Sequence, residues 1–142
     1  MVAGTPDYYQ TVRQTYGAAK SSLGVVVVTA SADNELVSVD GKGVIYGGGI
    51  FLDYTSSQKY GKPRLNIDGA NLSVMTFSSM WFDQLTERTS NALRLIQYDN
   101  VRFRYGVALD FGITFEQNVT LYYEETEAGT PTVVGRIIYA LM

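Results

Sequence analysis

Apolar and polar residues alternate almost without interruption in the last third of the chain. From residue 107 to residue 115 every second side chain is apolar, and Asp110 and Thr114 are among the residues between them. Successive side chains of a β-strand point to opposite faces, so this pattern predicts one long, half-buried strand over residues 107–115. The same alternation recurs in three other segments, residues 101–105, 119–124 and 136–141. These segments predict that the C-terminal part of the chain is β-sheet.

The first strand signal is Val25–Thr29, an unbroken run of β-branched residues. Such a run favours a strand that is buried on both faces. Asp40-Gly41 and Asp68-Gly69 are strong two-residue turn signals between strand-like segments, and they predict two β-hairpins. The strands expected around these turns cover residues 35–39, 43–54, 64–67 and 72–77.

Two segments interrupt the strand pattern. Gly47-Gly48-Gly49 stands inside a predicted strand, where glycines are typical of a bulge, a bend or the close approach of another backbone. We expect the sheet to turn a corner there. Residues 78–97 have mixed spacing and better helix formers, and they predict a long crossover with a short helical turn, as Greek-key sandwiches often need.

Seven to nine strands with short turns predict an all-β fold, a single antiparallel β-sandwich of the jelly-roll or Greek-key type, over residues 24–142. Residues 1–23 are polar, contain tyrosines and lack alternation, so they are predicted to be an N-terminal arm or a short helix. Thr5 and Pro6 could begin such a helix as N-cap and first residue. The alternative is an extended segment that lies across a neighbouring subunit.

Composition and charge exclude several classes of function. The chain has 142 residues, which suits one domain, and it contains no cysteine and no histidine. Disulfides, thiolate metal sites and histidine chemistry are therefore absent. The net charge of −3 argues against nucleic acid as a partner, because binding to the phosphate backbone needs a basic face. Its longest apolar run is too short to span a bilayer, and no secretory signal is recognisable, so no membrane partner is expected.

The search for catalytic, cofactor and metal motifs predicts none. Gly43–Gly49 lacks the Lys and Ser/Thr that end a phosphate-binding loop. Asp110 and Glu116 share a strand face, but six residues of strand would separate them by ~20 Å, too far for a glycosidase pair. The acidic segment 124–130 lacks the calcium-loop pattern and is expected to be a solvated hairpin tip. We therefore expect no cofactor and no enzymatic activity.

Aromatic residues are the remaining unusual feature, with 11 tyrosines, 6 phenylalanines and 1 tryptophan. Tyrosine combines a large contact area with a hydroxyl that tolerates water, which suits an interface with protein or sugar. Arg102 and Arg104, two residues apart on a predicted strand face, could grip an anion, but a charged edge facing solvent is the favoured interpretation. Six aromatic residues outside the predicted core are candidate interface residues: Tyr8, Tyr9, Tyr16, Tyr60, Trp81 and Tyr122.

Four segments carry a resemblance to a known group of proteins. They are Val39–Gly49, Leu52–Lys59, Leu65–Gly69 and Phe111–Glu116, within a region of about residues 36–125. In the general character of its sequence and in the placement of its turns, this region resembles small β-sandwich proteins encoded among the structural genes of tailed bacteriophages. No residue role can be carried over, because no invariant ligand or catalytic residue defines such proteins.

The resemblance implies a virion component such as a capsid decoration protein, a head or tail accessory protein, or a fibre module. It implies partners among virion proteins and further copies of the chain, and synthesis in the cytoplasm of a host cell. A carbohydrate-binding or receptor-binding β-sandwich module is the alternative, with a glycan as its possible ligand. A row of exposed aromatic residues on one sheet face would distinguish that module.

Overall fold

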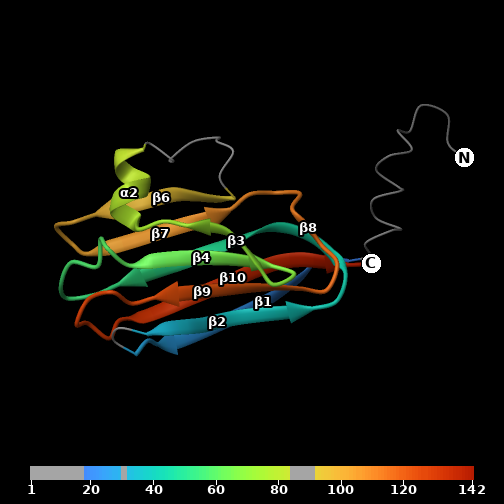
Figure 1. Ribbon diagram of the computed structural model, residues 1–142, viewed down its shortest axis with the longest axis horizontal. Coiled ribbons are helices and arrows are strands. Elements are labelled where there is room, and N and C mark those ends of the chain that lie inside the picture. The colour runs from blue at the N-terminus through green and yellow to red at the C-terminus, as the bar shows by residue number, and fades with distance from the viewer. Residues whose placement is uncertain (1–17, 30–31, 84–91) are drawn as a thin grey trace, which may run out of the picture.

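Two antiparallel β-sheets pack face to face in a sandwich (Figure 1). The computed structural model describes residues 18–29, 32–83 and 92–142. Sheet A contains, in spatial order, β1 (Lys20–Val27), β10 (Thr132–Leu141), β3 (Gly43–Asp53), β7 (Arg104–Leu109) and β6 (Leu93–Asp99), and β8 (Thr114–Phe115) also pairs with β3. Sheet B contains β2 (Asp33–Asp40), β9 (Asn118–Glu124), β4 (Lys62–Ile67) and β5 (Ala70–Val74). The predicted all-β sandwich is confirmed.

The strand pairs are nested along the sequence, which is the connectivity of a jelly roll. The β4–β5 hairpin is innermost, β3 pairs with β7 and β8, β2 pairs with β9, and β1 pairs with β10. The chain therefore behaves as a long two-stranded ribbon rolled up so that β1, β2, β3 and β4 alternate between the sheets. Strand β6 extends sheet A beyond β7.

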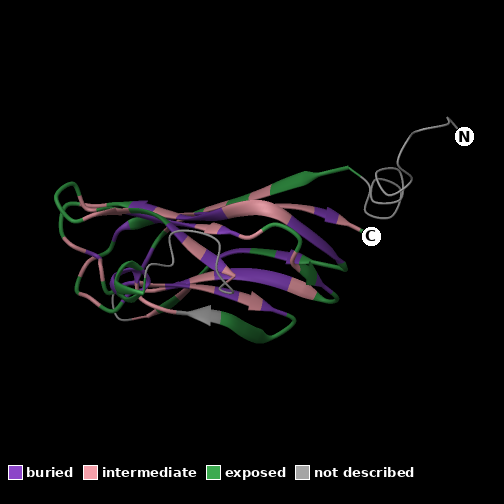
Figure 2. Ribbon diagram, turned by 90° about the horizontal axis from the view of Figure 1, so that it is seen from above, coloured by how far each residue is buried: buried purple, intermediate pink, exposed green. Residues whose placement is uncertain are grey.

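The core lies between the two sheets, where buried positions of both layers face each other (Figure 2). Helix α2 (Phe77–Phe82) places Phe77 between the sheets, with its ring 5.3 Å from that of Tyr105 and 6.2 Å from that of Tyr123. Thr76 caps this helix, because its side chain accepts a hydrogen bond from Ser79 N at 3.0 Å. The helical turn predicted within residues 78–97 is thus confirmed at its start.

The predicted burial of Val25–Thr29 on both faces is wrong. Strand β1 is the edge strand of sheet A, and the side chains of Val25 and Val27 are 60% and 67% exposed. Only Val28, just after β1, is fully buried in this run. Strand β1 also begins at Lys20, so residues 20–23, expected in the arm, belong to the sheet. Residues 1–17 of the predicted arm lie outside the described residues.

One of the two predicted hairpins forms. Asp68 and Gly69 have φ of 52° and 87° and join β4 to β5, as predicted. Asp40-Gly41 instead joins β2 in sheet B to β3 in sheet A, so the hairpin expected there is wrong. The turn signal is correct at both places, but the turn residues do not decide whether the next strand pairs with the previous one or crosses to the other sheet.

The long strand predicted over residues 107–115 is wrong, because it is broken into β7 and β8. The break is a turn around Gly112, whose φ is +92°, and it leaves Phe111 73% exposed. The sequence predicts residues 92–97 in the crossover segment because they include good helix formers. They lie mainly in β6, which pairs with β7. The strand expected from residue 101 begins only at Arg104, after a turn in which Phe103 has φ of +57°.

The glycine run in β3 coincides with a bulge, as predicted. Gly47 pairs with Ile138 and Ile45 pairs with Tyr139, which leaves Tyr46 as the extra residue. Gly48 has φ of +119°, and a Cβ there would lie 2.1 Å from the carbonyl oxygen of Arg136. The close backbone approach expected of this segment is therefore present.

Candidate functional site

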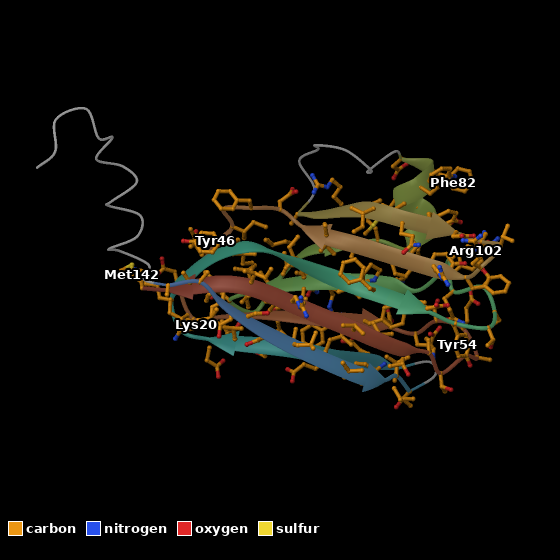
Figure 3. All side chains as sticks on the ribbon, turned by 180° about the vertical axis from the view of Figure 1, so that it is seen from behind. Lys20, Tyr46, Tyr54, Phe82, Arg102 and Met142 are labelled. Atoms are coloured by element: carbon orange, nitrogen blue, oxygen red, sulfur yellow. The ribbon has the colours of Figure 1, made fainter. Side chains whose placement is uncertain are left out.

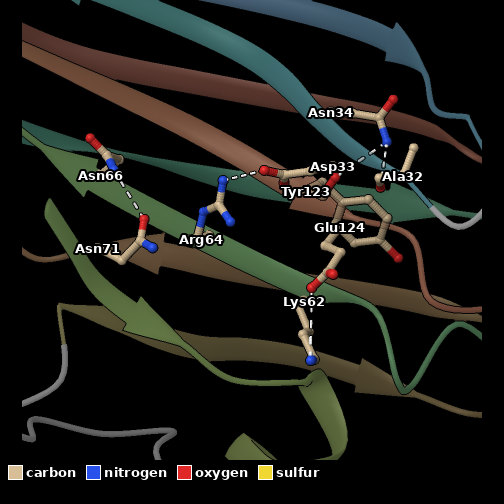
Figure 4. Close-up of polar contacts among 9 residues, drawn as sticks. All are labelled: Ala32, Asp33, Asn34, Lys62, Arg64, Asn66, Asn71, Tyr123 and Glu124. Atoms are coloured by element: carbon tan, nitrogen blue, oxygen red, sulfur yellow. Dashed lines mark hydrogen bonds and ion pairs between the residues drawn. The ribbon is translucent and has the colours of Figure 1, made fainter. Parts of the chain in front are cut away.

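The outer surface of sheet B is polar across all of its strands. Ser38 Oγ and Thr120 Oγ1 are 2.9 Å apart. Asn66 Nδ2 donates a hydrogen bond to Asn71 Oδ1 at 3.0 Å (Figure 4). Arg64 forms an ion pair with Asp33, and its guanidinium group stacks over the ring of Tyr122 on the same surface. These side chains pair with one another within the sheet, although Arg64 Nε is buried without a hydrogen-bond partner among the described residues. Such a polar surface is typical of a sandwich face in contact with water.

The outer surface of sheet A is different, because apolar side chains cross it from strand to strand. Leu23, Val25 and Val27 of β1 are 53%, 60% and 67% exposed. Val25 pairs with Val134 of β10, and Val134 pairs with Phe51 of β3, which places the three in one cross-strand row. We call the surface formed by Leu23, Val25, Val27, Phe51 and Val134 the apolar face. Figure 3 shows this side of the molecule.

The ring of Phe51 lies close to the backbone of two glycines, Gly49 on its own strand β3 and Gly106 on the neighbouring strand β7. A Cβ on Gly49 would lie 3.0 Å from Phe51 Cζ, and a Cβ on Gly106 would lie 2.7 Å from Phe51 Cδ1. Glycine at both positions therefore lets the ring lie flat against the sheet. Beside the ring is a shallow hollow of about 440 Å³, whose lining includes Asp53, Arg104 and Val134. Arg104 Nε and Asp53 Oδ2, 3.2 Å apart, form an ion pair at its border.

A second hollow, of about 570 Å³, opens on sheet A where the 110–113 turn separates β7 from β8. The rings of Tyr46 and Phe111 stack there, with centroids 5.6 Å apart. Arg94 and Asp110 also line it, and neither forms an ion pair with a described residue. Together with the apolar face, this hollow gives sheet A apolar and aromatic surface, and aromatic residues are enriched in protein interfaces.

A group of buried polar atoms lies away from this surface, around the 125–127 loop. The pKa of Glu125 is raised because burial disfavours its charged form, although Glu127 N donates a hydrogen bond to Glu125 Oε1 at 2.9 Å. Burial likewise raises the pKa of the Tyr123 hydroxyl. Glu125 Oε2, the Tyr123 hydroxyl and Gln58 Oε1 are buried and lack a hydrogen-bond partner among the described residues.

Asp68 is a second polar centre, on the β4–β5 turn. Its carboxylate accepts hydrogen bonds from the backbone N–H groups of Asn118 at 3.0 Å, Glu116 at 2.9 Å and Gln117 at 2.7 Å. These three donors hold the pKa of Asp68 below its usual range. The carboxylate thus joins the innermost hairpin to the turn before β9, which is a structural role.

The structure does not bring together the three predicted interface residues that it describes, Tyr60, Trp81 and Tyr122. Tyr8, Tyr9 and Tyr16 lie outside the described residues. Tyr60 is 50% exposed in the loop before β4, and Lys59 Nζ lies 5.1 Å from its ring centroid. Trp81 is 51% exposed on α2, and its ring stacks on Tyr98 at 5.2 Å. Tyr122 lies on the outer surface of sheet B, where its ring centroid is 4.4 Å from Arg64 Cζ.

Arg102 and Arg104 do not share a strand face either. Arg102 is exposed in the turn before β7, where its backbone N–H donates to Asp99 Oδ1 at 2.9 Å, and Arg104 pairs with Asp53. The prediction of an arginine pair on one strand face is therefore wrong.

Sequence reasoning missed the residues that form the apolar face, although a signal was present. Ile50-Phe51-Leu52 and Val133-Val134 are apolar runs without a polar partner. Neighbouring residues of a strand point to opposite faces of the sheet, so an apolar run places apolar side chains on both faces. If one residue of such a run is buried in the core, the next residue points to the outer surface. Ile50 and Val133 are fully buried, which leaves Phe51 and Val134 on the outer surface.

Within residues 18–29, 32–83 and 92–142 no three acidic side chains gather closely enough to hold a metal ion. The same part of the chain contains no helix with the length and apolar character needed to cross a membrane. The sequence matches no protein-family model and no characterised protein.

Proposed function

We propose that the chain is a non-enzymatic structural subunit of a virion and acts through protein–protein contacts on the apolar face of sheet A. The observation that carries the proposal is the cross-strand row of exposed Val25 and half-buried Val134 and Phe51, set against the polar surface of sheet B, where side chains pair with one another. Large apolar side chains grouped on one face are typical of an interaction surface.

The virion setting of this proposal is supported by the fold at the level of analogy. Jelly rolls serve in viral capsid proteins, and the same fold serves in lectins, so the fold alone does not separate the two roles. A rigid sandwich with one apolar face suits a subunit that is fixed to a lattice. The resemblance in residues 36–125 to phage structural proteins favours the same setting.

The proposal predicts that the gene lies in a viral genome, and its test uses particles of that virus. Particles are purified by density gradient, and the chain is sought in them by mass spectrometry. We expect the wild-type chain in the particles and a Val134→Lys variant to be reduced at least tenfold, because a buried unpaired charge opposes docking. Ser38→Lys, at an exposed position on sheet B, is the matched control and should be incorporated normally. Absence of the wild-type chain from particles, or normal incorporation of Val134→Lys, would contradict the proposal.

Carbohydrate binding is the second candidate, favoured by the half-exposed ring of Trp81. It ranks lower because Trp81 and Tyr122 lie on different elements and each already has one ring face covered, by Tyr98 and by Arg64. Binding of the purified chain to a glycan array, lost in Trp81→Ala and retained in Phe82→Ala, would place this function first. Phe82 is a suitable control because it is the next residue of α2 and is 79% exposed.

A further inference from the structure

Strand β1 is a regular sheet edge without a charged residue after Lys20. It pairs with β10 over eight consecutive residues without a register shift, and no described residue forms a hydrogen bond with the opposite edge of its backbone. Val28 N, just after the strand, donates to Pro131 O on the β10 side. Because the direction of backbone groups alternates, the N–H and C=O groups of Leu23, Val25 and Val27 point to the free edge.

The other sheet edges carry the features that normally prevent edge-to-edge pairing, which are charges, bulges and short length. Strand β2 has Asp33, Glu35 and Asp40 and a register shift, and β6 has Arg94 and Asp99 and a shift after Leu95. Strand β5 has five residues and an irregular pairing with β4. Strand β1 contains no charged residue between Ser21 and Val27, no proline and no bulge.

We propose that β1 pairs antiparallel with β1 of a second copy of the chain, about a two-fold axis at Val25, and joins the two A sheets into one continuous sheet. Backbone direction restricts the register to pairs of residues that both point to the free edge. Centring on Val25 places Leu23 opposite Val27 of the second copy, so the exposed apolar side chains form one unbroken strip. Each such facing pair exchanges two N–H···O bonds.

Charge also favours this arrangement. A two-fold contact brings a surface against itself, so like charges near the axis would repel. Lys20, the one charged residue of β1, is five positions from Val25 and lies outside the paired segment from Leu23 to Val27. A second copy therefore meets an uncharged edge along the whole paired segment.

The expected contact is small. A single added strand pair lies below the ~1,200 Å² that marks the low end of stable complexes, so we expect a dimer whose population rises with protein concentration. This pairing uses the backbone edge of β1 and goes beyond the proposed function, which concerns the outward side chains of the apolar face. The two can therefore fail independently.

The first experiment uses single cysteines, because the chain has none of its own. In the proposed register the two Val25 Cα atoms are about 5.5 Å apart, within the range of a disulfide. The two Leu23 Cα atoms are offset along the strand by ~13 Å, which is too far. Under mild oxidation of the folded protein we expect Val25→Cys to form a covalent dimer and Leu23→Cys to stay monomeric. Equal cross-linking of the two variants, or none in either, would overturn the proposal.

The second experiment measures solution mass by light scattering over a range of concentrations. Val25→Lys adds a charge to the edge at a side chain that is already 60% exposed, so it should fold and remain monomeric. Ser38→Lys, at an exposed position on sheet B outside the apolar face, should dimerise like the wild type. A monomeric wild type at every concentration, or a dimer that persists in Val25→Lys, would also overturn the proposal. Val134→Lys tests the docking of the proposed function, so the two failures are distinguishable.

Discussion

The ring of Phe51 on β3 lies against Gly106 on β7, so that a Cβ at residue 106 would be 2.7 Å from Phe51 Cδ1. The pairing register places the two residues directly opposite each other. The apolar face therefore depends on a residue without a side chain, because only glycine leaves room for the ring. This relationship links the stability of sheet A to the shape of its outer surface.

Gly106→Ala should destabilise the protein by about 1–3 kcal/mol, because the added methyl group forces the Phe51 ring off the sheet. The midpoint of chemical denaturation measures the change. Gly47→Ala is the matched control, since a Cβ there meets nothing within 4 Å, and its effect should be much smaller. Equal destabilisation by the two variants would show that Phe51 does not depend on Gly106.

Asp68→Asn should lower the thermal unfolding midpoint at neutral pH, because the charged acceptor of three backbone N–H groups is lost. The folded-state pKa of Asp68 lies below its usual value of 3.8. Its contribution to stability is therefore present above pH 3.8 and is lost as the pH falls through the folded-state value. The difference between wild type and Asp68→Asn should shrink as the pH falls below 3.8. Asp83→Asn, at the end of α2, serves as the control carboxylate.

Glu125→Gln should raise the thermal unfolding midpoint at neutral pH, because burial opposes the charged form of Glu125. The glutamine amide oxygen can still accept the hydrogen bond from Glu127 N. The pKa of Glu125 in the folded state is above its usual value of 4.5, so the wild type is relatively most stable below pH 4.5 and loses that stability as the pH rises through the folded-state value. Unfolding midpoints of both proteins at pH 4 and pH 7 measure the effect. A gain that does not depend on pH would contradict it.

Met80→Ala should cost about 2–5 kcal/mol, because Met80 is fully buried where α2 packs against the sandwich. Its neighbour Trp81 is half exposed and stacks on Tyr98, so Trp81→Ala should cost much less, on the order of one aromatic pair at ~1 kcal/mol. Denaturant midpoints of the two variants measure the contrast. Equal costs would mean that α2 is held by its exposed side rather than by its buried one.

The amino-acid sequence by itself determined the features that depend on neighbouring residues. Alternation predicted the β class, and Asp68-Gly69 predicted a hairpin because its φ values of 52° and 87° are a local property of those residue types. The glycines of β3 likewise predicted the bulge. Helix α2 could be expected from the break in alternation near residue 78.

Only the tertiary structure decided which sheet each strand joins and which strand becomes an edge. Val25 and Val27 are valines like the buried Val28, so residue type does not distinguish them. They are exposed because they lie on the outer surface of β1, which is the edge strand of sheet A. Asp40-Gly41 forms a turn whether the next strand pairs with β2 or crosses to sheet A. The apolar face is likewise a product of register, since Val25, Val134 and Phe51 are far apart in sequence and meet only through strand pairing. Long-range backbone hydrogen bonds set that register, and no local pattern specifies them.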